Sequence, residues 1–158
     1  LKGYLNKKEH DVLELGGGGS TIFFSKYAKS VKCLESFELW ASKINNKIKS
    51  LDLSNVSMEI HPYVLYSSED FIQSNYFKSI SKGKFDVILI DNYEEELQLR
   101  PFCFYEAEKI VKEGGIIIVD DSWRYKDLRI KNSAKSHIIF QSVGPARLGV
   151  TSTDIYFY

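Results

Sequence analysis

The stretch Asp11-Val-Leu-Glu-Leu-Gly-Gly-Gly-Gly-Ser-Thr-Ile-Phe-Phe24 decides the fold of this chain. Four consecutive glycines end an apolar run and precede a segment with helical character. A glycine-rich turn between a strand and a helix lets the backbone approach a ligand closely, and it directs helix N-terminal amides at that ligand. The stretch therefore indicates a ligand-binding strand–turn–helix unit. The spacing of its glycines distinguishes between the classes of ligand that such a unit can bind.

Length and composition indicate one globular domain over residues 1–158. The chain is 44% hydrophobic and 27% charged, with 21 basic and 21 acidic residues, so its formal net charge is zero. A neutral chain is not expected to have nucleic acid as its partner. The apolar runs are strand-sized and no signal-peptide pattern occurs. We therefore expect a cytoplasmic location and no contact with a membrane. Two isolated cysteines, Cys33 and Cys103, fit a reducing compartment and do not form a zinc motif.

Strand and helix patterns alternate along the chain. They predict strands over 11–15, 31–35, 56–64, 85–91 and 116–120, and helices over 20–28, 40–50, 69–80 and 101–112. Two further strands, 137–143 and 153–158, are separated by too few residues for a crossover helix, so they should pair as an antiparallel hairpin. The expected fold is a doubly wound α/β sheet with mixed strand direction at one edge. In such sheets ligands bind where the carboxyl ends of the strands meet the topological switch point, here beside the first strand.

The register of the glycines excludes one ligand class and disfavours another. A phosphate loop requires a lysine after its last glycine, and none follows here. A dinucleotide motif requires a third small residue, but the two possible registers place Thr21 or Ile22 there. A branched side chain at that position hinders the close packing of helix on strand.

Read as an acidic residue followed by spaced glycines, the stretch is Glu14-Leu-Gly16-Gly-Gly18-Gly-Ser20. In this form it resembles the first motif of the class I S-adenosylmethionine-dependent methyltransferases, and the resemblance extends along most of the chain. The resemblance implies a seven-stranded sheet of order 3-2-1-4-5-7-6 with the last strand antiparallel. It also implies S-adenosylmethionine as cofactor, with Gly16 and Gly18 under its methionine part, Glu14 orienting the loop and Ser20 in place of a third glycine.

Three residues after the second and third strands are further candidates for cofactor contacts. Glu35 ends the second strand, where a carboxylate can accept both ribose hydroxyls of S-adenosylmethionine or NAD. The alternative for Glu35 is a carboxylate that stabilises a helix N-terminus. The family often has an aspartate near the adenine where this chain has Ser67, so the resemblance offers only Ser67 or Ser68 for that contact.

The acceptor side is expected after the fourth and fifth strands. Asp91 follows the fourth strand without the two prolines of enzymes that methylate exocyclic amines. Asp91 and the pair Asp120-Asp121 resemble the Mg²⁺ ligands of catechol-type O-methyltransferases, in which the metal orients and acidifies a hydroxyl. Two departures are Asp121 in place of an asparagine and Glu94 in place of a lysine. The alternative for the aspartate pair is to cap a loop or line a polar pocket, and Glu94 to Glu96 are expected to be solvated.

Four residues are predicted to contact the methyl acceptor: Tyr93, Trp123, Tyr125 and Arg147. A basic run over 124–135 is interpreted as an exposed helix face, with docking of a substrate phosphate as the alternative. About ten residues precede the first strand, so the acceptor site is expected to be open, completed by a second subunit in a homo-oligomer, or completed by sequence not seen here.

The resulting hypothesis is a methyltransferase that transfers the methyl group of S-adenosylmethionine to an oxygen of a small molecule. Asp91, Asp120 and Asp121 are its candidate catalytic residues, and Asp91 is also a candidate for cofactor binding. Two alternatives stay open: an NAD-type oxidoreductase and a non-catalytic S-adenosylmethionine-binding scaffold domain.

Overall fold

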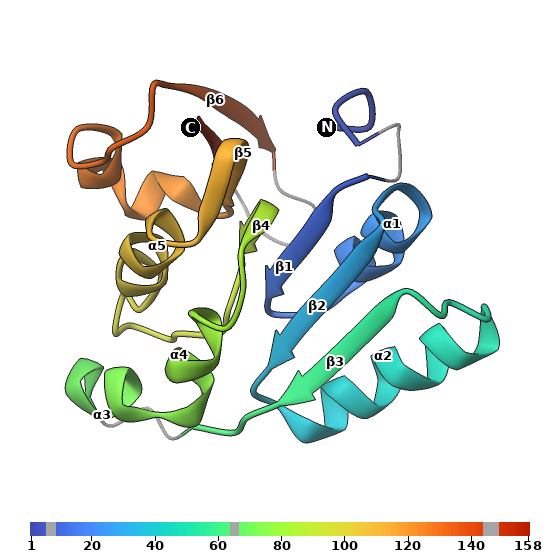
Figure 1. The fold of residues 1–158 in the computed structure, drawn as a ribbon. Coiled ribbons are helices and arrows are strands. Elements are labelled where there is room, and N and C mark those ends of the chain that lie inside the picture. Colours follow the sequence, from blue (N-terminus) through green and yellow to red (C-terminus); the bar gives the residue numbers. More distant parts are fainter. Residues whose placement is uncertain (6–8, 64–66, 144–148) are drawn as a thin grey trace.

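The computed structural model describes residues 1–5, 9–63, 67–143 and 149–158. Its strands form one seven-stranded sheet in the order β3-β2-β1-β4-β5-β7-β6, which confirms the predicted topology (Figure 1). The strands β1 to β5 run parallel, and β7 lies antiparallel between β5 and β6. The strands are β1 (Asp11–Leu15), β2 (Ser30–Glu35), β3 (Val56–Ile60), β4 (Phe85–Ile90), β5 (Val111–Val119), β6 (Ser136–Val143) and β7 (Val150–Phe157).

Helices connect the parallel strands and cover both faces of the sheet (Figure 1). Those on one face, α4 and α5, share a hydrophobic cluster with the sheet, whereas α1 belongs to a second cluster on the other face. The helices are α1 (Gly19–Tyr27), α2 (Glu38–Ser50), α3 (Ser68–Gln73), α4 (Asn75–Ile80) and α5 (Arg100–Glu108), followed by the short 3-10 helices η1 (Ser122–Arg124) and η2 (Lys126–Arg129).

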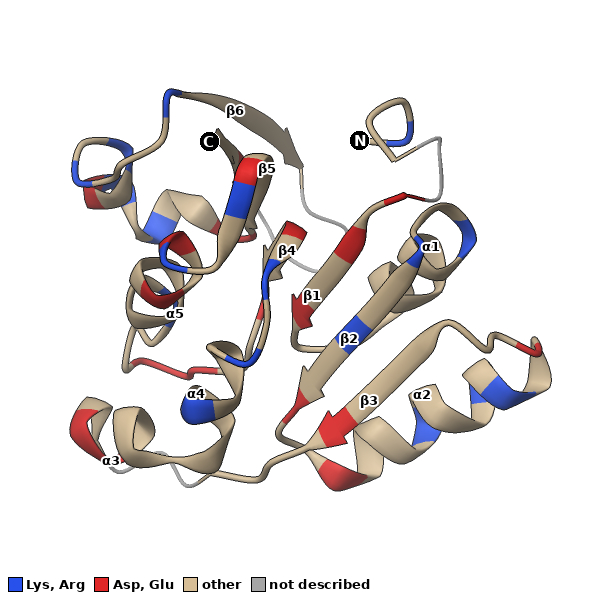
Figure 2. Ribbon diagram, in the orientation of Figure 1, with Lys and Arg blue, Asp and Glu red and all other residues tan. Residues whose placement is uncertain are grey.

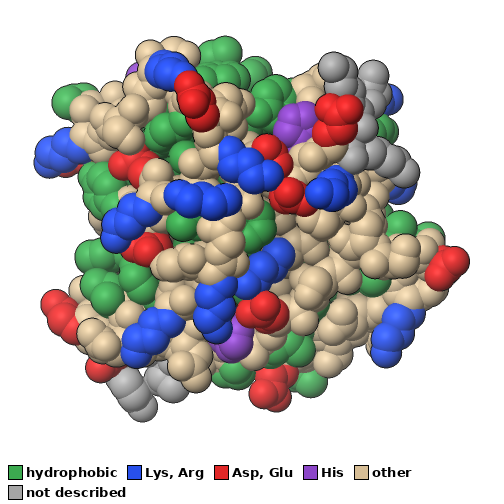
Figure 3. All heavy atoms as spheres, in the orientation of Figure 1, with side chains coloured by type: hydrophobic (Ala, Val, Ile, Leu, Met, Phe, Trp, Pro, Cys, Tyr) green, Lys and Arg blue, Asp and Glu red, His purple; other side chains and the backbone are tan. Residues whose placement is uncertain are grey.

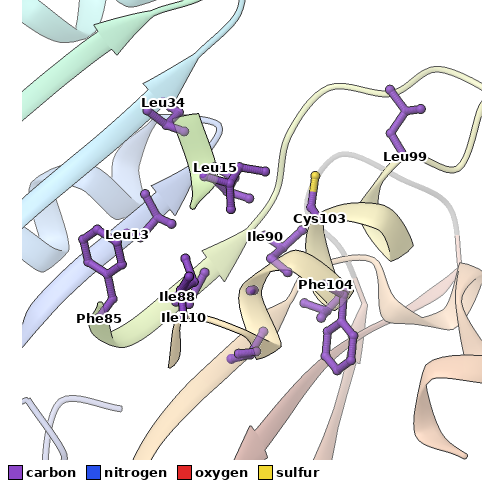
Figure 4. Close-up of a cluster of buried hydrophobic side chains, with 14 of the residues drawn as sticks. Leu13, Leu15, Leu34, Phe85, Ile88, Ile90, Leu99, Cys103, Phe104 and Ile110 are labelled. Atoms are coloured by element: carbon purple, nitrogen blue, oxygen red, sulfur yellow. The ribbon is translucent and has the colours of Figure 1, made fainter. Parts of the chain in front are cut away.

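The central strands are buried on both faces because successive side chains alternate between the two clusters. In β1, Leu13 and Leu15 point into the cluster under α4 and α5 (Figure 4), while Val12 packs with Phe24 of α1. These side chains are at most 1% exposed. The sheet is thereby held rigidly from both sides, and its strand ends become fixed points on which a site can be built.

Several element boundaries differ from the prediction, and three of the differences have a local reason. The third strand ends at Ile60 rather than at residue 64, because Pro62 has no N–H with which to continue the ladder. The helix expected over 69–80 is broken into α3 and α4 at Ser74, whose hydroxyl caps α4 by accepting from the Phe77 N–H at 3.1 Å. The fifth strand begins at Val111, which pairs with Phe85 across a β-bulge.

The surface carries both signs of charge close together. On the face shown in Figure 3, lysine and arginine side chains lie among acidic ones. Lys112, for example, contacts both Asp11 and Asp86, at 3.0 and 2.8 Å. Among the described residues, no helix is long and apolar enough to cross a membrane.

Candidate functional site

A cavity of about 560 Å³ opens at the carboxyl ends of β1, β2 and β4. Its position beside β1 is the switch point at which doubly wound sheets bind ligands. Acidic residues lie at several of these strand ends (Figure 2). The residues that line the cavity include Gly16, Gly17, Glu35, Phe37, Trp40, Tyr63, Asp91, Tyr93 and Arg100.

The glycine loop forms one wall of the cavity, and its first two glycines are required by space. Gly16 has φ +90°, and a Cβ there would lie 2.5 Å from the Asp91 carbonyl oxygen. A Cβ on Gly17 would lie 2.8 Å from the Cys33 Sγ. Gly18 has extended backbone, and a Cβ there would meet only the Ser20 Oγ at 4.0 Å. Gly16 and Gly17 line the cavity, whereas the predicted contact of Gly18 with the methionine part of the cofactor stays a prediction.

Glu14 lies underneath this loop rather than in the cavity. Its side chain is fully buried; Oε2 accepts a hydrogen bond from the Thr21 hydroxyl at 2.5 Å, and Thr21 in turn accepts from the Gly18 N–H at 2.9 Å. Oε1 has no hydrogen-bond partner among the described residues. Burial raises the pKa of Glu14 to about 7, although the neighbouring hydroxyls of Ser20 and Thr21 oppose the shift. Glu14 therefore holds the loop from below, which is the orienting role that the motif implies.

Glu35 presents its carboxylate to the cavity from the end of β2. Its Oε1 accepts from the N–H groups of Ser36 and Phe37 at 2.7 and 3.0 Å, and Oε2 accepts from the Gly17 N–H at 3.0 Å. A carboxylate offers about four acceptor positions, so roughly one remains, on Oε2. Glu35 thus connects the glycine loop to the start of α2 and keeps acceptor capacity for one further hydroxyl.

Aromatic side chains form the rest of the wall, and sequence reasoning missed most of them. Phe37 and Trp40 are 61% and 44% exposed, and the Trp40 Nε1 donates to the Gly17 carbonyl oxygen at 2.8 Å. On the opposite side, the Tyr63 hydroxyl donates to the Tyr93 carbonyl oxygen at 2.5 Å. An exposed aromatic residue two positions after Glu35 was the available signal, because large apolar side chains directly beyond a strand end are suited to packing against a ring.

Other predicted cofactor residues lie elsewhere. Ser67 caps α3 by accepting from the Asp70 N–H at 3.1 Å, and Ser68 begins that helix. Neither lines the cavity. Ser20 lies in the first turn of α1, next to Glu14. Arg147, predicted to contact the acceptor, lies outside the described residues.

Arg100, the first residue of α5, organises the side of the cavity at the ends of β4 and β5. Its Nη2 forms an ion pair with the Asp91 Oδ1 at 2.8 Å, and its Nη1 donates to the Asp120 carbonyl oxygen at 2.8 Å. Burial raises the pKa of Asp91 to about 6; Arg100 opposes this shift, and the charges of Asp120 and Asp121 add to it. Asp91, Asp120 and Asp121 therefore lie in one electrostatic neighbourhood that contains a fixed guanidinium.

These aspartates do not form the predicted Mg²⁺ site. Among the described residues, no three His, Cys, Asp or Glu side chains come together as metal ligands do. Asp91 is paired with Arg100, and the Asp120 Oδ1 accepts from the Thr153 hydroxyl at 2.7 Å. Asp121 stands in the left-handed region at φ +49° and its Oδ1 accepts from the Trp123 Nε1 at 3.2 Å. As the described residues are arranged, this donor set does not fit a divalent cation, so the structure gives no support to the three aspartates as metal ligands.

Glu94 corrects a second expectation, because it is buried rather than solvated. It is 2% exposed, its Oε2 accepts from the Arg100 backbone N–H at 3.0 Å, and its Oε1 forms an ion pair with the Arg124 Nη1 at 2.6 Å. The Tyr125 hydroxyl also donates to this carboxylate. Glu94 therefore joins the loop after β4 to η1, the segment after β5.

The residues predicted to contact the acceptor divide between two places. Tyr93 is 59% exposed and lines the cavity that contains Gly16. Trp123 and Tyr125 instead line a second hollow of about 610 Å³ between the start of α5 and the 3-10 helices. Tyr125 is only 4% exposed, and its buried hydroxyl has a partner because it donates to the Glu94 carboxylate.

Comparison with known proteins agrees with this architecture. No protein-family model and no curated protein matches the sequence. Among solved structures, the chain is similar to an O-methyltransferase from Bacillus cereus in complex with SAH (S-adenosylhomocysteine), at TM-score 0.73 and 22% identity, covering 99% of this chain and 77% of the other. It is also similar to the O-methyltransferase TomG from Streptomyces achromogenes in complex with SAM (S-adenosylmethionine), at TM-score 0.73 and 14% identity, covering 98% and 75%. An rRNA methylase from Streptococcus thermophilus matches at TM-score 0.64 and 11% identity, covering 98% and 89%.

At these identities the comparisons establish the fold. The chain has the α/β fold of the class I S-adenosylmethionine-dependent methyltransferases, with the predicted strand order. Function lies in sites that a fold carries, and it must be argued from the cavity.

Proposed function

We propose that this chain is an S-adenosylmethionine-dependent methyltransferase that transfers a methyl group to an oxygen of a small molecule. The observation that carries the proposal is the cavity at the ends of β1, β2 and β4, which combines the glycine loop, Glu35 and Asp91. The solved structures named above that contain SAM or SAH have the same fold, which supports the choice of cofactor.

The donor side of the cavity suits an adenosine with a charged tail. Gly16 and Gly17 expose backbone without side chains, so a ligand can approach the loop closely. Glu35 retains an acceptor position on Oε2 for a ribose hydroxyl, and Phe37 offers an exposed ring surface for a purine. When bound, S-adenosylmethionine supplies a methyl group on a sulfonium, which is transferred to a nucleophile as the S–CH₃ bond breaks.

Asp91 is suited to receive the proton of the acceptor hydroxyl. Its Oδ1 is held by Arg100, which leaves Oδ2 for the acceptor. With a pKa of about 6, the carboxylate is ionised at neutral pH and still basic enough for general-base work. In the balanced reaction the new O–CH₃ bond forms and the hydroxyl proton moves to Asp91. Asp120 and Asp121 keep this corner negative, and Tyr93 at the rim is placed to contact the acceptor.

Titration calorimetry with S-adenosylhomocysteine tests the donor assignment. We expect saturable one-to-one binding, weakened about 10- to 100-fold in Glu35→Ala because a charge-assisted hydrogen bond is worth about 1.5–3 kcal/mol. Glu59→Ala is the matched control: Glu59 also lies near a strand end, in β3, but it pairs with Lys32 and His61 and does not line the cavity. Binding of NAD without binding of S-adenosylhomocysteine would refute the proposal in favour of an oxidoreductase.

Transfer itself is tested with tritiated S-adenosylmethionine and a panel of phenols, alcohols and carboxylic acids. We expect label in at least one product, and loss of that product with Asp91→Asn. If the chain binds the donor but labels only RNA, its acceptor is RNA, as the name of the rRNA methylase implies for that protein, and not a small molecule.

A further inference from the structure

Arg100 bridges the ends of two neighbouring strands and is almost completely buried. Its residue exposure is 7%, which is unusual for an arginine unless its charge is paired. The Nε donates to the Asn92 carbonyl oxygen at 3.2 Å, Nη1 to the Asp120 carbonyl oxygen at 2.8 Å, and Nη2 pairs with Asp91. The guanidinium is therefore fixed by three contacts to the residues that follow β4 and β5.

The backbone of Arg100 is held as firmly as its side chain. Its N–H donates to the Glu94 Oε2 at 3.0 Å, and Pro101 follows it in the first turn of α5. Glu94 is in turn paired with Arg124 of η1. The Arg100 side chain therefore cannot move away without breaking its contacts to two segments, the residues after β4 and those after β5.

A divalent cation at this corner would compete with Arg100 for the Asp91 carboxylate and the Asp120 carbonyl oxygen. Mg²⁺ is bound by carboxylate and carbonyl oxygens in a near-octahedral shell, and of Asp91, Asp120 and Asp121 it is Asp91 that lines the cavity. Arg100 cannot lose its proton in a protein, so its charge is permanent and repels a second cation. The guanidinium also neutralises part of the charge of Asp91, Asp120 and Asp121 that would attract a metal.

We propose that Arg100 is the resident cation of this corner, and that the chain binds donor and acceptor there without a divalent metal. The binding of donor and acceptor rests on the proposed function. The preference for arginine over a metal depends only on the residues around Asp91, Asp120 and Arg100. Two N–H groups of the guanidinium have no acceptor among the described residues, and Arg100 lines the cavity. The arginine can therefore offer hydrogen bonds to an acceptor oxygen, where a metal would offer coordination.

Titration with Mn²⁺, followed by electron paramagnetic resonance, tests this directly. The wild-type chain, with and without S-adenosylhomocysteine, should show no saturable site up to about 1 mM Mn²⁺, the weak end of protein sites for divalent cations. Arg100→Gln should gain one Mn²⁺ per chain, because its carboxylates lose their resident cation. Arg100→Lys, which retains a cation, and the double variant Asp91→Asn/Arg100→Gln should not gain one.

Arg129→Gln is the matched control. Arg129 also forms an ion pair with a buried aspartate, since its Nε lies 2.7 Å from the Asp154 Oδ2, and this pair lies away from the cavity. It should gain no Mn²⁺ site. One Mn²⁺ per wild-type chain that disappears in Asp91→Asn would overturn the proposal, and so would a folded Arg100→Gln that binds no more Mn²⁺ than wild type. Circular dichroism establishes folding, and if Arg100→Gln does not fold, the wild-type and Arg100→Lys titrations still decide. Calorimetry with S-adenosylhomocysteine is read separately, so failure of the proposed function is distinguishable.

Discussion

At the scale of single residues, Gly16 has two independent reasons to be glycine: its positive φ, and the contact that a Cβ would make with the Asp91 carbonyl oxygen. We expect Gly16→Ala to lower the free energy of unfolding by about 1–3 kcal/mol from the backbone strain alone. Urea denaturation followed by circular dichroism measures this.

Gly19→Ala is the control within the same glycine run. Nothing lies within 4 Å of the position of its Cβ, and Gly19 begins α1. Alanine should there be neutral or stabilise the protein by up to about 1 kcal/mol. Equal losses of unfolding free energy in Gly16→Ala and Gly19→Ala would mean that an added methyl group is equally unfavourable at both positions, contrary to the structure.

Glu14 predicts a pH dependence of stability. Its pKa is about 7 in the folded chain against 4.5 for the free side chain, so the folded state binds more protons between these values. Stability should therefore fall as pH rises through this window and become level above it. Across this window the loss of stability is at most about 3.4 kcal/mol.

Glu14→Gln removes this titration and keeps an oxygen that can accept from the Thr21 hydroxyl. The difference in unfolding free energy between variant and wild type should grow in favour of the variant from pH 4.5 to pH 8, measured by urea denaturation. Asp91 also has a raised pKa, caused first by its burial, which both chains share. Its charge adds to the raised pKa of Glu14, and that part belongs to the Glu14 titration. Parallel profiles would mean that Glu14 titrates normally.

At the scale of elements, Glu94 connects the loop after β4, the start of α5 and η1. Removing this buried carboxylate leaves the Arg100 N–H without its acceptor and takes the ion-pair partner from Arg124, which keeps its bond to the Glu95 carbonyl oxygen. We expect Glu94→Ala to lower the unfolding free energy by about 3 kcal/mol, as for other broken buried pairs. Glu96→Ala, two residues away and exposed, should change it by less than about 0.5 kcal/mol. A similarly small change in unfolding free energy for Glu94→Ala and Glu96→Ala would show that Glu94 does not hold these segments together.

The elements themselves were largely predictable, because their signals are local. Alternating or continuous apolar runs identified all seven strands, and the short link between the last two required an antiparallel hairpin. The break at Ser74 was missed because apolar residues continue at helical spacing on both sides of it. The early start of β5 was missed because its first residues are paired through a bulge that depends on β4.

At the scale of the whole molecule, the candidate site was predictable only where one strand end carries the signal. Glu14 is one of the last two residues of β1, and Gly16, Glu35 and Asp91 follow or end a strand. The sheet order gathers the last three at one cavity. Arg100 and Glu94 were not predictable, because their burial depends on Asp120 and Arg124, which lie 20 or more residues further along the chain. A charged residue in a charged stretch looks solvated until the partners from another loop are known.

Because the cavity joins the ends of three strands, a ligand that fills it should stabilise the whole fold. At a concentration of S-adenosylhomocysteine about 100-fold above its Kd, linkage gives about 2.7 kcal/mol. For a domain of this size that should raise Tm by about 5–10 °C, as measured by differential scanning fluorimetry. Glu35→Ala at the same ligand concentration should show a smaller shift, and Glu59→Ala the full one. A full shift in Glu35→Ala would mean that the ligand binds somewhere other than at the end of β2.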